Sequence, residues 1–404
     1  MKLVAVSEHF FPRVGGTVNY VHETLSALAR HGVDVELWVP GPEPEDPYPA
    51  GMAQPDYRVN WINADYPATG NPSRVLRYRF CRLVNELALH RIECDQAPDV
   101  VHVVFGLFVM EILDTKSLRQ AGVRSVATVH NLPPHECRVV SPDAGMIRQL
   151  RETIRLMLVG WKNNRRLRQH VYDRYIVPSE QVFNLAKRVI PQQKIETIGH
   201  GPTGSLMNAM KPPLSRAAGS GKPVRILTAG GYAPHKRQHL IPEAAEQLKA
   251  LGVGFEWDVV GPDRRIPGYR EMIEQDLSNR KLSGTVRLHG AVPFDSLALL
   301  YDKANIFVQP SIEEGFCITA LDAAAAGLPV IASRAGALAQ ITAISKGALV
   351  ESKASVLAAK IFEFVENDRW GDPQVTSKSV IAEFSWQRAA SKLREIYEDV
   401  VGAK

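Results

Sequence analysis

The sequence predicts an α/β protein made of two parallel-sheet domains, and three observations lead to that prediction. Short apolar runs alternate with segments of helical periodicity along the chain, as in proteins whose parallel strands are joined by helices. At 404 residues the chain is longer than one ordinary core can fill. A stretch rich in Pro, Gly and Ser at 211–223 separates two such series. We therefore expect domains at 1–210 and 224–385, joined by this linker.

The first domain is expected to begin with a strand at 3–7 and a helix at about 18–30. In that helix Val21, Leu25 and Leu28 recur at helical spacing, and a glycine just beyond it ends the helix. The further strands of this series are expected at 33–39, 100–105, 125–130 and 175–177. The second series is expected to place strands at 224–229, 256–260, 286–289, 306–309 and 330–333, with a last helix near 386–401.

Composition favours an ordinary cytoplasmic enzyme. Hydrophobic residues make up 45% and charged residues 23% of the chain, and a net charge of +5 does not by itself indicate nucleic-acid binding. Residues 1–6 lack a signal-peptide pattern, and the longest apolar run, 100–113, is too short to span a bilayer. The four cysteines lack metal-ligand spacing and are expected to be reduced thiols: Cys81, Cys94, Cys137 and Cys317.

The segment 310–322 is the most informative about function. Glu314 stands just before a glycine turn, and Asp322 follows eight positions later inside an Ala-rich helical pattern. The first N–H groups of a helix are unpaired and bind anions, so the turn at 315–317 is a candidate phosphate site. Carboxylates beside it would accept hydrogen bonds from hydroxyl groups. A phosphate with several hydroxyls describes a sugar nucleotide; an ordinary strand–turn–helix with a charged edge is the alternative.

Residues 310–331 resemble the signature of the retaining glycosyltransferases of family 4, which have the two-domain GT-B fold. That signature reads Pro-Ser-x-x-Glu-Gly-Phe, a second Glu after seven residues, and then Ala-x-Ala-x-Gly-x-Pro-Val-Ile; here Asp322 stands at the second acid and is one methylene shorter. The resemblance implies two Rossmann-like domains facing a central cleft, with the nucleotide-sugar on the C-terminal domain and the acceptor on the N-terminal side. It also implies that the terminal helix, 386–404, packs back on the N-terminal domain.

The loop 228–237 follows the first strand of the second domain, where the family has Gly-Arg, a short loop and Lys-Gly. Lys236 matches the lysine, but Gly231 occupies the arginine position. The resemblance implies that these cations neutralise the leaving diphosphate. Arg237 or His235 could replace the missing guanidinium, and the sequence leaves both open.

The first domain has two weaker candidates. Gly15 and Gly16 precede a helix, where glycines let the backbone approach a phosphate, although a plain turn is the common explanation. The resemblance implies that they touch the donor diphosphate or the acceptor. His130 ends a predicted strand, at the edge where open α/β sheets bind ligands, and the resemblance places it beside the transferred bond; capping of the strand is the alternative. A dinucleotide fingerprint is not expected, because Pro40 stands where strand two would end in an acid.

The loops after two strands of the second domain complete the site that the resemblance implies. Gly261 follows one strand, and Gly290 and Ala291 follow another; in the family these loops surround the nucleotide and read its base, although turn geometry alone can explain glycines there. The motifs 178–180 and 198–201 are similar to family markers and are taken as structural, with His200 near the cleft but not catalytic.

Two basic clusters lie in the N-terminal half. A solvated helix face is the slightly preferred interpretation; contact with an anionic membrane surface or with a phosphorylated or lipid-linked acceptor is the alternative. The clusters comprise Arg74, Arg77, Arg79 and Arg82, and Arg148, Arg151, Arg155, Lys162, Arg165, Arg166 and Arg168.

Together these features favour a hexosyltransferase-type enzyme of carbohydrate biosynthesis. It would move a sugar, with retention, from a nucleotide-sugar, with a UDP-sugar preferred over a GDP-sugar, to a hydroxyl of a glycolipid, polysaccharide precursor or small natural product. His130, Lys236 and Glu314 are the expected catalytic residues. The donor would also contact Gly315, Phe316 and Cys317 at the helix start, with Asp322 at the ribose. No metal or cofactor and no nucleic acid is expected; a sugar-nucleotide epimerase, a sugar phosphorylase and a non-catalytic sugar-nucleotide-binding partner are the alternatives.

Overall fold

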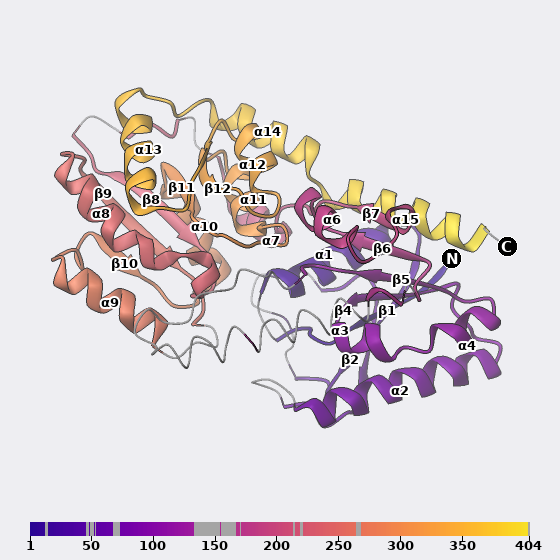
Figure 1. Cartoon of the computed structure of the whole chain (residues 1–404). Coiled ribbons are helices and arrows are strands. Elements are labelled where there is room, and N and C mark those ends of the chain that lie inside the picture. The colour runs from indigo at the N-terminus through magenta and orange to yellow at the C-terminus, as the bar shows by residue number, and fades with distance from the viewer. Residues whose placement is uncertain are drawn as a thin grey trace. The chain divides into compact units, whose positions relative to one another are not determined.

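The structure is a computed structural model of the chain. It describes residues 1–12, 15–45, 48, 52, 54–67, 73–132, 154, 167–169, 171–212, 215–218, 221–263 and 268–402. The described residues form two compact units (Figure 1). The first comprises residues up to 132, 167–200 and 385–402, and the second comprises 201–384. Each unit has its own hydrophobic core.

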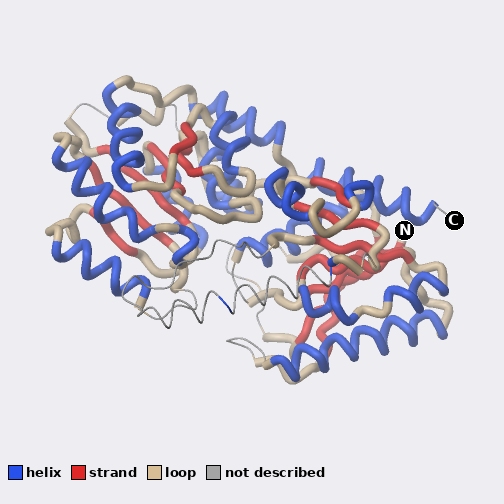
Figure 2. The backbone as a smooth tube through the Cα atoms, in the orientation of Figure 1, coloured by secondary structure: helices blue, strands red, loops and turns tan. Residues whose placement is uncertain are grey.

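The first unit contains a seven-stranded parallel sheet in the order β3-β2-β1-β4-β5-β6-β7. Its strands are β1 (Lys2–Ser7), β2 (Asp34–Pro40), β3 (Arg58–Ile62), β4 (Val100–Phe105), β5 (Arg124–Thr128), β6 (Arg174–Val177) and β7 (Ile195–Thr197). The helices that flank this sheet are α1 (Gly16–Arg30), α2 (Arg74–Glu93), α3 (Leu107–Ile112), α4 (Thr115–Gln120), α6 (Glu180–Ala186) and the C-terminal α15 (Trp386–Gly402) (Figures 1 and 2). The short helix η1 (Gln192–Lys194) precedes β7.

The second unit contains a six-stranded parallel sheet in the order β10-β9-β8-β11-β12-β13. Its strands are β8 (Val224–Ala229), β9 (Phe255–Val260), β10 (Val286–Leu288), β11 (Ile306–Gln309), β12 (Val330–Ser333) and β13 (Ala348–Val350). Its helices are α7 (Gly204–Ala209), η2 (Pro234–Lys236), η3 (Gln238–Leu240), α8 (Ile241–Ala250), α9 (Tyr269–Asn279), α10 (Phe294–Lys303), α11 (Ile318–Ala325), α12 (Leu338–Ile344), α13 (Ala354–Glu366) and α14 (Pro373–Glu383).

These elements follow from local chemistry. The run Val100–Phe105, apolar except for His102, becomes the buried central strand β4, as expected for a parallel sheet covered on both faces. Helix α2 begins where the Ser73 hydroxyl accepts a hydrogen bond from the N–H of Leu76. Helix α1 ends at Arg30 with His31 as its C-cap residue, and Gly32 follows with a φ of 80°, which glycine adopts at little cost.

The parallel α/β architecture is confirmed, and every predicted strand is present with ends within two residues of the prediction. Three strands were not predicted: β3, β7 and β13. Each lies at the edge of its sheet. Edge strands are covered on fewer sides, so their apolar pattern is weak.

The chain passes from the first unit to the second between His200 and Gly201, before the predicted linker 211–223. Helix α7 packs against α10 and α11, so 201–209 belong to the second unit. The C-terminal helix α15 belongs to the first unit and packs on α1. No helix among the described residues is long and apolar enough to cross a membrane.

Candidate functional site

In the second unit, the loops that follow β8, β9 and β10 lie together at the carboxyl edge of the sheet. The N–H of Gly230 donates to the Val260 carbonyl at 2.8 Å, and the N–H of Gly261 donates to the Gly290 carbonyl at 3.2 Å. Gly261 has a φ of 155°, and a Cβ there would lie 2.2 Å from the Gly230 carbonyl oxygen. Only glycine allows this approach, so the predicted donor residues Gly261 and Gly290 are brought together by backbone contacts.

Lys236 and Glu314 form an ion pair at the same edge. Lys236 ends the short helix η2, and Glu314 lies in the loop between β11 and α11. The Lys236 Nζ lies 2.6 Å from Oε1 and 2.7 Å from Oε2 of Glu314. Burial acts to raise the pKa of the Glu314 carboxyl, but the charge and hydrogen bonds of Lys236, with smaller contributions from Ser311 and His235, lower it overall. Glu314 is therefore a buried carboxylate that is ionised at neutral pH.

Helix α11 begins directly after the Gly315–Phe316–Cys317 turn. Cys317 is its N-cap residue, with a left-handed φ of 86°, and the Phe316 ring packs edge-on against Phe384. Burial raises the pKa of the Cys317 thiol to about 12, so it is not a thiolate at neutral pH. The turn and the Lys236–Glu314 pair therefore place backbone N–H groups, a cation and a carboxylate at the sheet edge.

Asp322 is held by a partner that the sequence did not indicate. Its Oδ1 accepts the N–H of Thr203 at 2.7 Å, and its Oδ2 accepts the Thr203 hydroxyl at 3.0 Å. Asp322 is buried and lies on α11. Each carboxylate oxygen can accept a second hydrogen bond, so the geometry allows a further hydroxyl but assigns Asp322 a structural contact first.

The guanidinium of Arg237, in the loop after β8, is already hydrogen-bonded within the second unit. Arg237 has a left-handed φ of 59°, and its guanidinium donates to the Ser352 carbonyl at 3.2 Å. The His235 carbonyl accepts the N–H of Ile312 at 2.9 Å, which joins this loop to the segment that carries Glu314.

Two family descriptions match the chain: "Glycosyltransferase Family 4" over residues 14–201, and "Glycosyl transferases group 1" over residues 213–399. The chain is a family 4/group 1-type glycosyltransferase. Enzymes of this type transfer sugars from nucleotide-sugars. The GT-B fold that the resemblance predicted is likewise confirmed.

Relatives and solved structures agree with that assignment. A GDP-mannose-dependent alpha-mannosyltransferase of Mycolicibacterium smegmatis is 27% identical over 414 residues, which cover 100% of this chain and 99% of that protein. The putative colanic acid biosynthesis glycosyltransferase WcaL of Salmonella typhimurium is 26% identical over 221 residues, which cover 50% of this chain and 53% of WcaL. This match thus spans about half of that relative.

Among solved structures, sucrose-phosphate synthase from Thermosynechococcus elongatus has a TM-score of 0.76 at 22% identity, with full coverage of both chains. Anabaena Alr3699/HepE in complex with UDP and glucose has a TM-score of 0.66 at 14% identity and covers 98% of this chain and 99% of that one. At these identities the likeness shows the fold alone.

The first unit of the glycosyltransferase contains the other predicted site residues. His130 lies just beyond β5, its Nε2–H donates to the Val104 carbonyl at 2.8 Å, and its ring meets Tyr20 edge-on at 4.6 Å. Desolvation lowers the pKa of His130 to about 4, so it is neutral at pH 7. Gly15 is the N-cap of α1, and Gly16 is the first residue of that helix.

The first basic cluster lies on α2, and all four of its arginines are among the described residues. Of these four arginines, three pair with acids: Arg77 lies 3.6 Å from Glu8, Arg79 contacts Asp65, and Arg82 lies 3.3 Å from Glu86. Arg74 instead donates to the Tyr78 hydroxyl. This pattern favours the solvated helix face. Of the second cluster, only Arg168 lies within the described residues, and it is exposed.

Sequence reasoning missed a buried histidine in the first unit. His102 is fully buried in β4, where its Nδ1 lies 2.6 Å from the Tyr397 hydroxyl and its Nε2 lies 2.8 Å from the Thr128 hydroxyl. Desolvation lowers the pKa of His102 to about 3. Tyr397 lies on α15, so this neutral imidazole ties the C-terminal helix to the centre of the first sheet. A lone His in an apolar strand was the only signal.

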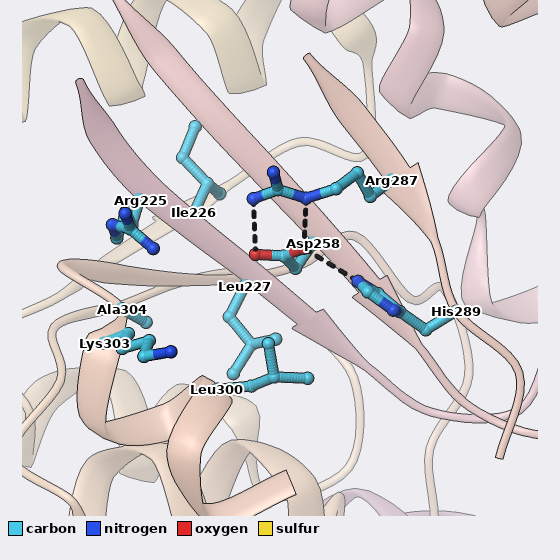
Figure 3. A pocket seen from close by; sticks show the side chains of 9 residues that line it. All are labelled: Arg225, Ile226, Leu227, Asp258, Arg287, His289, Leu300, Lys303 and Ala304. Atoms are coloured by element: carbon cyan, nitrogen blue, oxygen red, sulfur yellow. Dashed lines mark hydrogen bonds and ion pairs between the residues drawn. The ribbon is translucent and has the colours of Figure 1, made fainter. Parts of the chain in front are cut away.

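A pocket of about 210 Å³ is lined by residues of β8, β9 and β10, by His289 just after β10, and by the end of α10 (Figure 3). Asp258 is its central acid: Arg287 donates to it at 2.9 Å, and His289 lies 2.7 Å from it. Within the described residues, no group of three or more His, Cys, Asp or Glu side chains is arranged to hold a metal ion.

Proposed function

We propose that this glycosyltransferase moves a sugar, with retention of anomeric configuration, from a UDP-sugar to a hydroxyl acceptor. The observation that carries the proposal is the Lys236–Glu314 ion pair beside the N-terminus of α11. A cation and a helix N-terminus at one edge suit a diphosphate, and a buried carboxylate suits sugar hydroxyls.

In this mechanism the bond between the anomeric carbon and the phosphate oxygen breaks as the acceptor oxygen bonds to the same face. The acceptor's proton passes to the departing phosphate, so no enzyme nucleophile is needed. Lys236 and the N–H groups near Gly315–Cys317 stabilise the negative charge that grows on the leaving oxygen. Glu314 orients sugar hydroxyls, and the neutral His130 offers a hydrogen bond beside the transferred bond.

The remaining donor contacts are assigned to the other predicted site residues. Gly261, Gly290 and Ala291 would contact the nucleoside, Asp322 the ribose, and Gly15 and Gly16 the diphosphate or acceptor. A guanosine donor is the competing choice, because the relative that matches the whole chain is described as GDP-mannose-dependent. We propose that Lys236 supplies the charge that a metal supplies in other transferases, so activity should survive a chelator.

The acceptor is proposed to be a glycolipid, a polysaccharide precursor or a small natural product, reached by a cytoplasmic enzyme that can contact the inner membrane face. Flotation with anionic vesicles tests the membrane part. Co-flotation that high salt abolishes would support it, and absence of co-flotation at low salt would refute it.

The central experiment measures nucleotide release from UDP-, GDP- and dTDP-sugars, with and without acceptor-containing extracts. Acceptor-dependent release that is lost in Lys236→Ala and Glu314→Ala supports the transferase and identifies the base. Conversion of the donor without an acceptor indicates an epimerase. Tight donor binding without turnover across the panel indicates a non-catalytic binding partner.

A further inference from the structure

The buried side chain of Tyr232 joins the three loops of the donor edge. Tyr232 follows β8, and its hydroxyl lies 2.9 Å from the Val259 carbonyl and 2.8 Å from the His289 carbonyl. Its single hydrogen is shared between these two acceptors, one at the end of β9 and one just after β10. The Tyr232 N–H also donates to the Pro262 carbonyl at 3.0 Å. One residue therefore contacts the loops that contain Gly261 and Gly290.

Arg270, on the first turn of α9, is hydrogen-bonded to residues after β9 and at the end of β10. Its guanidinium donates to the Leu288 carbonyl at 3.1 Å and to Asp263 Oδ2 at 3.2 Å, and it lies 5.4 Å from the centre of the Tyr232 ring. A Cβ added to Gly290 would lie 3.9 Å from its Nη1. The planar, five-donor guanidinium can make these contacts at once, which an ammonium cannot.

The loop after β10 is fixed on its other side as well. The His289 ring is bonded to Asp258, and the His289 N–H donates to the Val259 carbonyl at 2.7 Å (Figure 3). Gly290 is half-buried, as His289 is, and Ala291 is exposed. Residues 290–291 are thus accessible to a ligand and follow a residue whose ring and N–H are both hydrogen-bonded.

We infer that Arg270 and Tyr232 are positioning residues that set the choice of nucleobase. They hold the N–H of Gly290 and the N–H and carbonyl of Ala291 where a base edge can be read, while the Gly290 carbonyl accepts the N–H of Gly261. This inference rests on the proposed function, because it takes the ligand at this edge to be a nucleoside diphosphate. A base is discriminated by hydrogen bonds of fixed direction, so loosening the loop should blur the choice of base more than it weakens diphosphate binding.

The test is isothermal titration of UDP, GDP and pyrophosphate into the wild type, Arg270→Gln and Tyr232→Phe. The matched control is Arg280→Gln. Arg280 is the C-cap residue at the other end of α9, where it pairs with Asp276 and Glu246. We express the preference for UDP as the GDP dissociation constant divided by the UDP dissociation constant. Arg270→Gln should lower this preference by about tenfold, the loss typical of one charge-assisted hydrogen bond. Pyrophosphate affinity should change by less than about twofold, and Arg280→Gln should change neither quantity.

Tyr232→Phe should lower the same ratio by a smaller factor, and it provides the test if Arg270→Gln does not fold. A wild type that prefers one base, with both variants keeping that preference, overturns this inference and leaves the proposed function standing. Equal losses of pyrophosphate and nucleotide binding also overturn it, because they indicate general disruption. A wild type that binds no nucleoside diphosphate overturns both proposals.

Discussion

Replacing Lys236 with alanine leaves the Glu314 carboxylate buried without its cation. Glu314 is 9% exposed, and both of its oxygens lie within 2.7 Å of the Lys236 Nζ. Removing one partner of a buried pair costs about 3–5 kcal/mol, because a desolvated charge remains. Gln309 still approaches Oε1 at 3.4 Å, and water can enter the space left by Lys236, so we expect the lower value, about 3 kcal/mol.

The pH dependence of this loss follows from the direction of the Glu314 pKa. In the wild type that pKa is lowered, so the pair contributes stability above the unfolded-state pKa and loses it as pH falls through the folded-state value. Without Lys236, burial is opposed only by weaker contacts, and the pKa of Glu314 should rise above its ordinary value. The variant should then gain stability relative to the wild type as Glu314 takes up a proton on acidification.

Urea unfolding at pH 7.5 and at pH 5 measures both effects. The cost of Lys236→Ala should be about 3 kcal/mol at pH 7.5 and clearly smaller at pH 5. The double variant Lys236→Ala/Glu314→Ala should recover part of the loss. Lys360→Ala, which breaks the more exposed Lys360–Glu363 pair of α13, is the matched control and should have a much smaller effect at both pH values. A cost below about 1 kcal/mol, or one that is the same at both pH values, would refute the reasoning.

Three further predictions concern residues that support the site. Asp322→Ala should lower the free energy of unfolding, measured by thermal unfolding, by about 2 kcal/mol, because the Thr203 N–H and hydroxyl lose their acceptors. Thr203→Val removes only the hydroxyl and should cost about 1 kcal/mol. Equal costs would contradict the structural role of both hydrogen bonds. The neutral, buried His102, whose pKa is about 3, should make stability fall by up to about 1.4 kcal/mol per pH unit below pH 6.5. A His102→Gln variant with an unchanged acid slope would argue against this. Gly261→Ala should cost about 3 kcal/mol, because its Cβ meets the Gly230 carbonyl, and wild-type stability of this variant would show that the loops yield easily.

Local patterns in the sequence were sufficient for most strands of the two sheets. The run Val100–Phe105 reads as a buried strand because apolar residues on both faces need a sheet covered on both faces. Lys236 and Glu314 were selected as site residues through their resemblance to family motifs, and the ion pair between them is a finding of the structure.

Contacts between distant segments could not be predicted in the same way. Thr203 and Asp322 are 119 positions apart, and His102 and Tyr397 are 295 apart. Nothing in the local pattern of either partner specifies the other, because each pairing depends on how helices pack on the sheets. The edge strands β3, β7 and β13 escaped prediction for a related reason, since their stability comes from a neighbouring strand more than from their own apolar pattern.

The glycine at 231 raises the question of how the leaving diphosphate is neutralised, since the resemblance expects an arginine there. Arg237, one of the two expected replacements, donates to the Ser352 carbonyl instead of pointing freely into the loop. Leaving-group stabilisation should therefore depend unusually strongly on Lys236, and a new guanidinium at 231 should relieve that dependence.

Gly231→Arg tests this directly. We expect it to restore about tenfold of the donor turnover lost in Lys236→Ala, the contribution typical of part of one preorganised charge. Gly231→Ala adds a side chain without charge and is the matched control, with no restoration expected. If both substitutions restore turnover equally, the effect is one of loop geometry; if neither does, position 231 does not face the diphosphate, and the correspondence of this loop with the family's Gly-Arg element fails at that residue.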